Sequence, residues 1–276
     1  MNRHDSNLKT PWMKTNFWET ALAVRCCQVT KEFGRGESRT PVLRGINLEI
    51  KLGEITMLVG QSGCGKTTLL SVIAGLLEPT GGELEVLGSR PIEMTDMERV
   101  VFRRRNLGFA FQQFNLLPSL TAAENAAVPL LAAGIKRTEA VEKAVDLLAR
   151  LGMGQRVYSL PNQLSGGQQQ RIAFARALIH EPRLVVCDEP TSALDAETGQ
   201  TVMELLASIA VRPDCAVVIV THDDRIFRFA HVIHSMSDGR IIGSERRERP
   251  NFGQKNRSGR QFETASGVAC ERLTRA

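Results

Sequence analysis

The residues with the clearest chemical potential form the stretch from Gly60 to Thr68. It fits the spacing G-x-x-x-x-G-K-[ST], in which glycines let successive backbone N–H groups curl around a polyphosphate. The ammonium of Lys66 would neutralise phosphate oxygens, and the hydroxyl of Thr67 would complete the shell of a Mg²⁺ ion. The alternative is a glycine-rich turn that binds nothing. The candidate phosphate-binding residues are Gly60, Gln61, Ser62, Gly63, Cys64, Gly65, Lys66, Thr67 and Thr68.

The elements around this stretch favour the phosphate-binding interpretation. An apolar run, Ile55 to Val59, precedes it and predicts a strand, and a run from Leu69 to Leu77 follows it and predicts a helix. The order strand, glycine-rich loop, helix is the context that the motif requires. The helix N-terminus would add a partial positive charge toward the bound anion.

Two further apolar runs end in polar side chains that could act on a phosphate. The run Leu184 to Cys187 ends in Asp188 and Glu189, and the run Ala216 to Val220 is followed by Thr221, His222 and Asp223. Neither run alternates, which is typical of parallel strands buried on both faces. Residues 196–209 between them predict a crossover helix, so the core is expected to be α/β with a mainly parallel sheet. Ligands bind such sheets at the carboxyl ends of the strands.

The N-terminal part predicts a separate antiparallel unit. The segments Leu22–Cys26, Leu43–Ile50 and Gly82–Leu87 alternate well enough to form antiparallel strands. Phe33 lies between the first two of them. Its ring could stack on a purine or fill the core, and spacing alone favours the core.

A helical insertion is predicted between the strands of the α/β core. A charged helix over residues 90–105 precedes a short strand, Leu107–Phe111, and then Gln112. Residues 115–162 are rich in alanine and leucine at helical spacing. After the insertion, Ser165 and Gln168 form the S-x-x-Q pattern of a capping box ahead of a helix over residues 169–180.

Charge is distributed so that the predicted core is neutral. The chain of 276 residues has a net charge of +5 and a pI near 9.0, but residues 21–244 carry 24 basic and 24 acidic side chains. The excess lies at the ends, with eight basic and four acidic residues over 245–276. This distribution argues against a nucleic-acid-binding face on the core and leaves the tail as the part that could touch anionic lipid.

Other classes of protein find no support in the pattern. The N-terminus has charged residues and no apolar stretch of the signal-peptide type, and no segment approaches the roughly 20 apolar residues that cross a bilayer. The six cysteines show no C-x-x-C or Cys/His pairing with metal spacing, so no zinc site is expected. Any membrane association is expected to depend on a partner.

Taken together, residues 22–244 resemble the ATP-binding cassette (ABC) family of transport ATPases. Gly60 to Thr67 resembles the Walker A loop, Asp188 and Glu189 resemble Walker B with the catalytic glutamate, and Leu164 to Gln168 resembles the LSGGQ signature. Gln112 matches the Q-loop glutamine, Ser192 to Asp195 the D-loop, and His222 the switch histidine. Within the family, Phe111 to Pro118 is similar to the lipoprotein-releasing, macrolide-export and heterocyst glycolipid-export branch.

The resemblance implies a fold and a set of residue roles. The fold would be a P-loop NTPase (RecA-like) core over residues 21–244, with an antiparallel β subdomain and a helical signature subdomain over about 114–165, flanked by a flexible arm (1–20) and a basic disordered tail (245–276). Glu189, His222 and Gln112 would be catalytic, and Thr67, Gln112 and Asp188 would hold Mg²⁺. The remaining implied ATP contacts are Phe33 at the adenine, where the family usually has tyrosine, and Ser165, Gly166, Gly167, Gln168 and Asp195 from the opposite subunit.

The resemblance also implies a function and partners. Two copies would enclose two ATP molecules head to tail, and hydrolysis would drive a separate integral membrane permease, with a periplasmic membrane-fusion protein as a further partner. The chain would be an exporter subunit held peripherally at the cytoplasmic face of the inner membrane. The alternative is an ABC ATPase that regulates a membrane partner, in cell-wall remodelling or signalling, without moving a solute.

Overall fold

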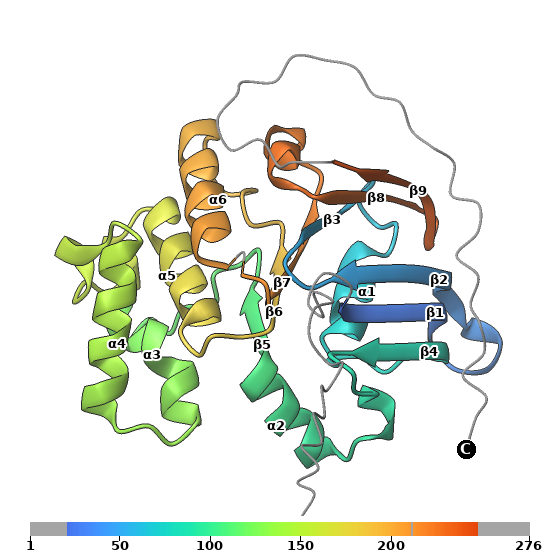
Figure 1. Ribbon diagram of the computed structural model, residues 1–276, viewed down its shortest axis with the longest axis horizontal. Coiled ribbons are helices and arrows are strands. Elements are labelled where there is room, and N and C mark those ends of the chain that lie inside the picture. Colours follow the sequence, from blue (N-terminus) through green and yellow to red (C-terminus); the bar gives the residue numbers. More distant parts are fainter. Residues whose placement is uncertain (1–20, 211, 248–276) are drawn as a thin grey trace, which may run out of the picture.

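A computed structural model describes residues 21–210 and 212–247 of the chain. The arm predicted over residues 1–20 lies outside the described residues, as does nearly all of the tail predicted over residues 245–276. The described part is built from two sheets and six α-helices, arranged so that a three-stranded sheet and a group of helices lie at opposite ends of the molecule (Figure 1).

The central element is a six-stranded sheet in which every neighbouring pair except the last is parallel. This confirms the expected α/β core. All six residues of the strand at Ala216–Thr221 are buried, which explains why its sequence does not alternate. In spatial order the strands are β5 (Leu107–Ala110), β6 (Leu184–Asp188), β7 (Ala216–Thr221), β3 (Ile55–Val59), β8 (Val232–Ser237) and β9 (Arg240–Arg246).

The second sheet is antiparallel, as predicted, and has the order β2–β1–β4. Its strands are β1 (Leu22–Phe33), β2 (Thr40–Lys51) and β4 (Gly81–Val86). β1 is longer than the sequence indicated because it passes through an irregularity at Gln28, which has φ +49° and donates its backbone N–H to Asn47 Oδ1. The alternation of apolar and polar residues breaks there, so the pattern does not predict that the strand continues to Phe33.

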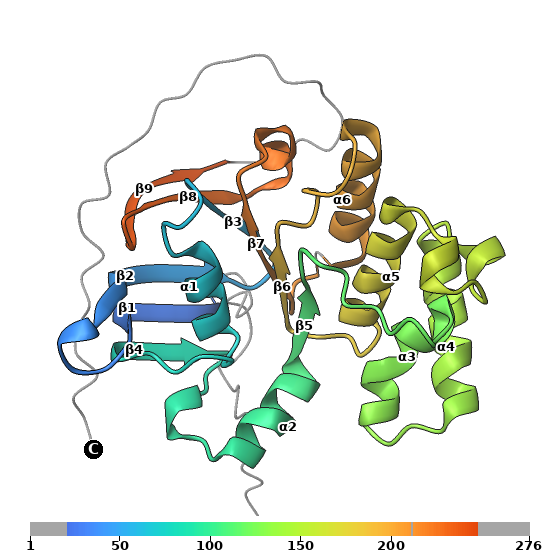
Figure 2. The ribbon, with the colours of Figure 1, turned by 180° about the vertical axis from the view of Figure 1, so that it is seen from behind.

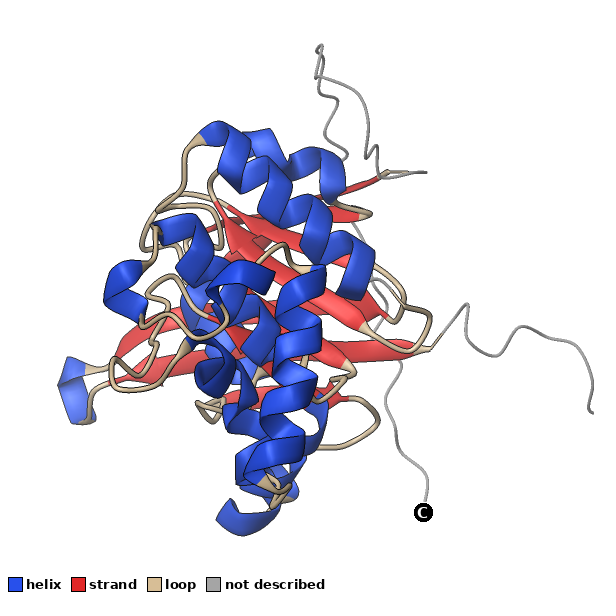
Figure 3. Ribbon diagram, turned by 90° about the vertical axis from the view of Figure 1, so that its left-hand side faces the viewer, coloured by secondary structure: helices blue, strands red, loops and turns tan. Residues whose placement is uncertain are grey.

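Six α-helices and several short 3-10 turns complete the described part. Seen from the side, helices lie in front of the six-stranded sheet, over the face turned toward the viewer (Figure 3), whereas α1 packs on the opposite face. The view from behind shows α3 and α4 at the end of the molecule away from β1, β2 and β4 (Figure 2). The α-helices are α1 (Lys66–Ile73), α2 (Asp96–Asn106), α3 (Ala122–Ala132), α4 (Arg137–Arg150), α5 (Gly166–Leu178) and α6 (Ala196–Ala210), and the 3-10 turns are η1 (Gly36–Ser38), η2 (Pro91–Glu93), η3 (Gly154–Arg156), η4 (Pro161–Gln163) and η5 (Asp224–Phe229).

Side chains on the two faces of the central sheet belong to two separate hydrophobic clusters. On one face Val185, Cys187 and Ile219 pack with apolar residues of α3, α4, α5 and α6. On the other face Val186 and Val218 pack with α1 and with the three-stranded sheet. α1 and α5 therefore lie on opposite faces of the sheet, a separation that matters for the site.

The last two strands form the hairpin that the Asp238-Gly239 pair, at the centre of the segment from Val232 to Ile242, predicts. Asp238 and Gly239 occupy its turn with φ +45° and +70°, which is the geometry that an Asp-Gly pair favours in a two-residue hairpin. β9 continues to Arg246, two residues beyond the boundary placed after Ser244. Arg246 ends the strand in a two-point ion pair with Glu54, at 2.7 and 3.2 Å, which the sequence did not reveal.

Candidate functional site

The loop between β3 and α1 follows a path that only glycine permits at two points. Gly60 has φ +154°, and a Cβ there would lie 2.2 Å from the carbonyl oxygen of Met236 on β8. Gly65 has φ +102°, caps the N-terminus of α1, and would bring a Cβ within 3.0 Å of the Val42 carbonyl on β2. The loop is thus pressed between β8 and β2, with the unpaired N–H groups of the helix start beside it.

The ammonium of Lys66 lies over this loop. Its Nζ donates to the carbonyl oxygens of Gly60 and Gln61, at 2.8 and 2.9 Å, and lies 3.8 Å from Cys64 Sγ. Lys66 is buried, so its charge is poorly solvated. A buried cation with backbone N–H groups on one helix end is a set of groups suited to a polyphosphate.

Side-chain oxygen atoms that could coordinate a metal ion lie close together where the end of β6 approaches the start of α1. The Thr67 hydroxyl donates to Asp188 Oδ1 at 3.3 Å. Burial raises the pKa of Asp188, with a further upward contribution from the charge of Glu189 and opposing ones from Thr67 and Lys66. A half-buried carboxylate whose charge is incompletely compensated fits a divalent cation, and hydroxyl and carboxylate oxygens are ligands that Mg²⁺ prefers.

The same oxygen atoms indicate how the coordination shell of such a cation would be completed. Among the described residues no group of three or more His, Cys, Asp or Glu side chains could hold a metal ion by itself. Mg²⁺ usually keeps several waters and is bound by one or two protein groups together with phosphate oxygens. The set of Thr67 and Asp188 fits that mode, with the amide of Gln112 lining the same pocket.

The side chains of Glu189 and His222 lie next to each other in the lining of the site. Glu189 has φ +47°, a strained conformation for a non-glycine residue. Its Oε1 lies 2.8 Å from His222 Nδ1, while its Oε2 is buried and has no hydrogen-bond partner. The carboxylate is 13% exposed and the imidazole 69% exposed. One carboxylate oxygen of Glu189 is therefore left without a partner in this conformation.

Most of these groups line one pocket of about 490 Å³. The structure thus brings together most of the residues predicted for the phosphate end of the site. Cys64 and Asp188 lie beside the pocket through their contacts with Lys66 and Thr67. The predicted residues that line the pocket are Gly60, Gln61, Ser62, Gly63, Gly65, Lys66, Thr67, Thr68, Gln112, Glu189 and His222.

The predicted signature residues do not reach this pocket. The capping box is confirmed: Ser165 Oγ accepts from the Gln168 N–H at 3.4 Å, and Gln168 Oε1 accepts from the Ser165 N–H at 3.0 Å. Ser165 is exposed, whereas Gly167 is buried against α6, where a Cβ would lie 2.4 Å from Thr198 Cγ2. Gly167 therefore allows α5 and α6 to pack closely, a role that the sequence did not indicate.

Asp195 and Phe33 also lie apart from the pocket. Asp195 Oδ1 accepts the backbone N–H groups of Glu197 and Thr198, at 3.1 and 3.0 Å, and so caps α6. Phe33 ends β1 with its ring 42% exposed and Lys31 Nζ 5.2 Å from the ring centroid. The core position that spacing favoured for Phe33 is wrong, and the ring presents a face to solvent.

Sequence reasoning missed the residues that hold the loop in place. Val42 lines the pocket, and the turn of the β8–β9 hairpin ties the loop to β2: Gly239 donates to the Cys64 carbonyl at 3.1 Å and accepts from the Arg44 N–H at 2.8 Å. Asp238 adds an ion pair with Arg44 at 3.0 Å. The Asp-Gly pair signalled a hairpin, but no sequence signal places that hairpin against the phosphate loop.

The fold and the site define a class of protein. A glycine-rich loop between a parallel strand and a helix, a carboxylate at the end of a neighbouring strand, and a second carboxylate beside a histidine are the parts of a P-loop nucleotide hydrolase. Within the described residues, no helix is both long enough and apolar enough to span a bilayer.

Comparison with known proteins gives the family. Residues 43–192 match the model of the ABC transporter family, which is more than half of the chain. The chain therefore belongs to the ABC transporter family, and its site is that of an ATPase. This confirms the resemblance that the motifs indicated.

Two named relatives fall in the branch indicated by Phe111 to Pro118. The macrolide export ATP-binding/permease protein MacB of Aggregatibacter actinomycetemcomitans is 42% identical over 231 residues, which are 84% of this chain and 36% of MacB. The lipoprotein-releasing system ATP-binding protein LolD of Geobacter metallireducens is 42% identical over 214 residues, 78% of this chain and 95% of LolD. The chain thus spans about a third of MacB and almost all of LolD.

Solved structures agree with the assigned fold. The ATP-binding cassette MJ0796, solved as a dimer in a post-hydrolysis state bound to ADP and Pi, is 39% identical and superposes with a TM-score of 0.75 over 81% of this chain and 98% of that chain. A second dimeric structure of MJ0796, described as a bacterial ABC transporter cassette, gives the same values.

Proposed function

We propose that this chain is the ATP-hydrolysing subunit of an ABC exporter, that it works as a head-to-tail homodimer, and that it drives a separate integral membrane permease. The observation that supports the proposal is that the two proposed halves of a nucleotide site lie apart within one chain. The phosphate pocket lies at the N-terminus of α1, and the exposed Ser165 lies at the N-terminus of α5, across the central sheet. A second copy is needed to bring the two halves to one nucleotide.

The pocket residues divide the work of hydrolysis in this proposal. Lys66 and the loop N–H groups bind the β- and γ-phosphates. Thr67, Asp188 and Gln112 would hold Mg²⁺, which would neutralise charge on the phosphate oxygens. Glu189, which lines the pocket and has one unpaired carboxylate oxygen, orients the attacking water and accepts its proton. His222, which is hydrogen-bonded to Oε1 of Glu189, senses the γ-phosphate.

The second copy contributes the N-terminus of its α5 to the nucleotide site. Ser165 and Gly166 lie at the N-terminus of α5, whose N–H groups favour an anion. If the γ-phosphate contacts α1 of one chain and α5 of the other, ATP binds the closed pair better than the open one. Hydrolysis removes that difference, and this change in free energy is what moves the permease.

The names of the relatives support the proposed direction of transport. The names of MacB and LolD refer to macrolide export and lipoprotein release, which supports an exporter in preference to an importer. MacB carries an ATP-binding part and a permease in one protein, which supports a permease partner for this shorter chain. The proposal places the chain at the cytoplasmic face of the inner membrane. A membrane-fusion protein has no support from the site or the relatives and is not part of the proposal.

Replacement of Glu189 by Gln tests the proposal. Because the amide keeps the size and the hydrogen bond but cannot take a proton, we expect ATP binding to persist, turnover to fall by about a hundredfold or more, and the MgATP-bound dimer to become long-lived. Size-exclusion chromatography with MgATP and a phosphate-release assay measure both. Glu142, exposed on α4, supplies the matched Glu→Gln control. Wild-type turnover in Glu189→Gln, or a chain that turns over ATP fully as a monomer, would refute the proposal.

A further inference from the structure

The loops that carry Glu189 and His222 leave neighbouring strands. β6 and β7 are parallel, with Asp188 paired to Val220, and the Glu189 N–H donates to the Val220 carbonyl at 2.8 Å. The strand pairing ends at this point, and Glu189 and His222 lie in the loops that follow β6 and β7. The relative position of the two side chains therefore depends on contacts made within the loops themselves.

One such contact joins the loops directly. Thr191, two residues after Glu189, donates its hydroxyl to Asp223 Oδ2 at 3.0 Å, and Asp223 directly follows His222. Thr191 is 1% exposed, and α6 passes close to its methyl group at Gly199, where a Cβ would lie 3.4 Å from Thr191 Cγ2. The Thr191 side chain is thus fixed on one side by packing and on the other by a hydrogen bond.

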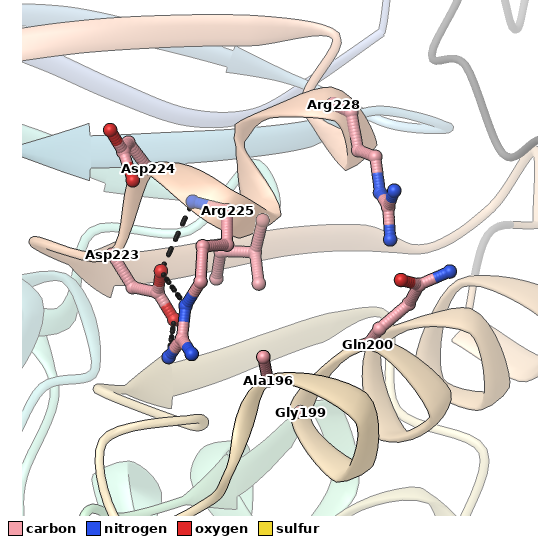
Figure 4. Close-up of a pocket in the computed structure, with 8 residues that line it drawn as sticks. Ala196, Gly199, Gln200, Asp223, Asp224, Arg225 and Arg228 are labelled. Carbon is pink, nitrogen blue, oxygen red and sulfur yellow. Dashed lines mark hydrogen bonds and ion pairs between the residues drawn. The ribbon is translucent and has the colours of Figure 1, made fainter. Parts of the chain in front are cut away.

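Asp223 is held from its other side by Arg225. The guanidinium Nε donates to Asp223 Oδ1 at 2.7 Å and Nη2 donates to Oδ2 at 2.8 Å, while the Arg225 backbone N–H also donates to Oδ1 at 3.0 Å. Figure 4 shows the two side chains joined in this way, at the edge of a pocket of about 390 Å³ between α6 and η5.

The charge state of Asp223 fixes the direction of the bond from Thr191. Burial alone would raise the pKa of Asp223, but the hydrogen bonds from Arg225 and Thr191 outweigh it and the pKa is lowered. An ionised carboxylate can only accept hydrogen bonds, so the Thr191 hydroxyl must be the donor. A charge-assisted bond of this kind is stronger than one between neutral groups.

We propose that Thr191, Asp223 and Arg225 form a latch that sets the distance between Glu189 and His222, so that they act as positioning residues for ATP hydrolysis. The inference rests on the roles proposed above for Glu189 and His222. None of the three latch residues lines the phosphate pocket. Loss of the latch should therefore slow the chemical step and leave nucleotide binding intact.

The test compares two substitutions at Thr191 in the full-length chain. Thr191→Val keeps the methyl group and the volume but removes the hydroxyl, whereas Thr191→Ser keeps the hydroxyl. We expect Thr191→Val to lower kcat for ATP by about tenfold, since small misplacements of catalytic groups have effects of that order or larger, with KM changed less than twofold. Thr191→Ser should stay within about threefold of the wild-type kcat. Thr201→Val is the matched control, because Thr201 on α6 is only partly buried and its hydroxyl donates to the Glu197 carbonyl at 3.0 Å, away from Asp223.

A coupling measurement separates a latch from a merely structural role. If the latch acts through His222, Thr191→Val should lower kcat by less than twofold in a His222→Ala background. An equal loss in both backgrounds, or a Thr191→Val enzyme with the wild-type kcat, would overturn the latch. Arg225→Met, at a half-exposed side chain, repeats the test should Thr191→Val not fold. Full turnover in Glu189→Gln would instead refute the proposed site itself.

Discussion

Lys66 Nζ lies 2.8 Å from the carbonyl oxygen of Gly60, so the ammonium at the start of α1 is bonded to the first residue of the loop that precedes it. The contact closes the loop on itself, with a further bond to the Gln61 carbonyl. The charge is thereby held within the pocket, at the point where phosphate oxygens are expected, instead of extending into solvent. Phosphate would replace carbonyl oxygens as the partner of a cation already in place.

Replacement of Lys66 by Ala should abolish tight nucleotide binding. The lysine is buried, and hydrogen bonds from a charged group with little access to water contribute about 1.5–3 kcal/mol. We therefore expect the affinity for ATP to fall by roughly a hundredfold. Isothermal titration calorimetry measures it, with Lys143→Ala on the exposed face of α4 as the control. An unchanged dissociation constant would contradict the phosphate-loop assignment.

The exposed ring of Phe33 should contribute to adenine binding. Stacking of a base on an aromatic ring contributes about 1–3 kcal/mol, so Phe33→Ala should weaken ATP binding by roughly tenfold. Phe33→Tyr keeps the ring face and should bind like the wild type. Because the side chain is 42% exposed, neither change should alter the thermal unfolding midpoint by more than a few degrees. Equal ATP affinities for the wild type and both variants would show that the adenine base does not stack on Phe33.

Local patterns in the sequence were sufficient to predict the phosphate end of the site. The loop from Gly60 to Thr68 is contiguous. Asp188 ends one buried strand and His222 directly follows another, so their placement at one sheet edge follows from the parallel topology. The capping box at Ser165 was predictable for the same reason, because both partners lie within four residues.

Contacts between distant segments were not predictable in this way. The carbonyl of Met236 that excludes a side chain at Gly60, and the Gly239 bonds to Cys64 and Arg44, join residues that are far apart in the chain. The exposure of Phe33 was not predictable either, because the register of β1 against β2 shifts at several points before the strand ends at this residue.

Gly167 provides a test of the packing between α5 and α6. A Cβ at Gly167 would lie 2.4 Å from Thr198 Cγ2, and the Thr198 N–H is held by Asp195, so the helices must separate. We expect Gly167→Ala to lower the free energy of unfolding by about 1–3 kcal/mol in urea titrations. At the neighbouring Gly166 the nearest atom to a Cβ is the Ala193 carbonyl oxygen at 3.6 Å, an ordinary contact, so Gly166→Ala is the control and should change stability by less than about 0.5 kcal/mol.

A second substitution identifies the atom responsible for that loss. Thr198→Ser removes the γ-methyl and keeps the hydroxyl. In the double variant Gly167→Ala/Thr198→Ser the overlap is gone, so most of the stability lost in Gly167→Ala should return. If the double variant were as unstable as the sum of the two single changes, the cause would lie in the backbone of α5 and not in the Thr198 methyl group.

His234 should make the stability of the chain depend on pH. It lies on β8 between β3 and β9, with Nδ1 2.7 Å from Ser244 Oγ and with Nε2 buried and unpaired. Burial, with a smaller contribution from Arg246, lowers the pKa of His234 to about 4. The unfolded chain, with a histidine pKa near 6.5, then binds a proton more readily than the folded chain between these two values. Stability is therefore complete above about pH 6.5 and is lost as the pH falls toward 4.

The expected loss from His234 between pH 7.5 and pH 5 is about 2 kcal/mol, which urea titrations at the two pH values can resolve. Burial lowers the pKa of His180 and His231 as well, so the wild-type chain should lose more than this. His234→Gln removes one contribution only, and its pH-dependent loss should be smaller than that of the wild type by about that amount. The comparison rests on the two slopes, because Gln at a buried position also changes the stability at pH 7.5. Equal slopes for both chains would mean that His234 gains a proton in the folded state as readily as in the unfolded one, and that the unpaired Nε2 has access to water.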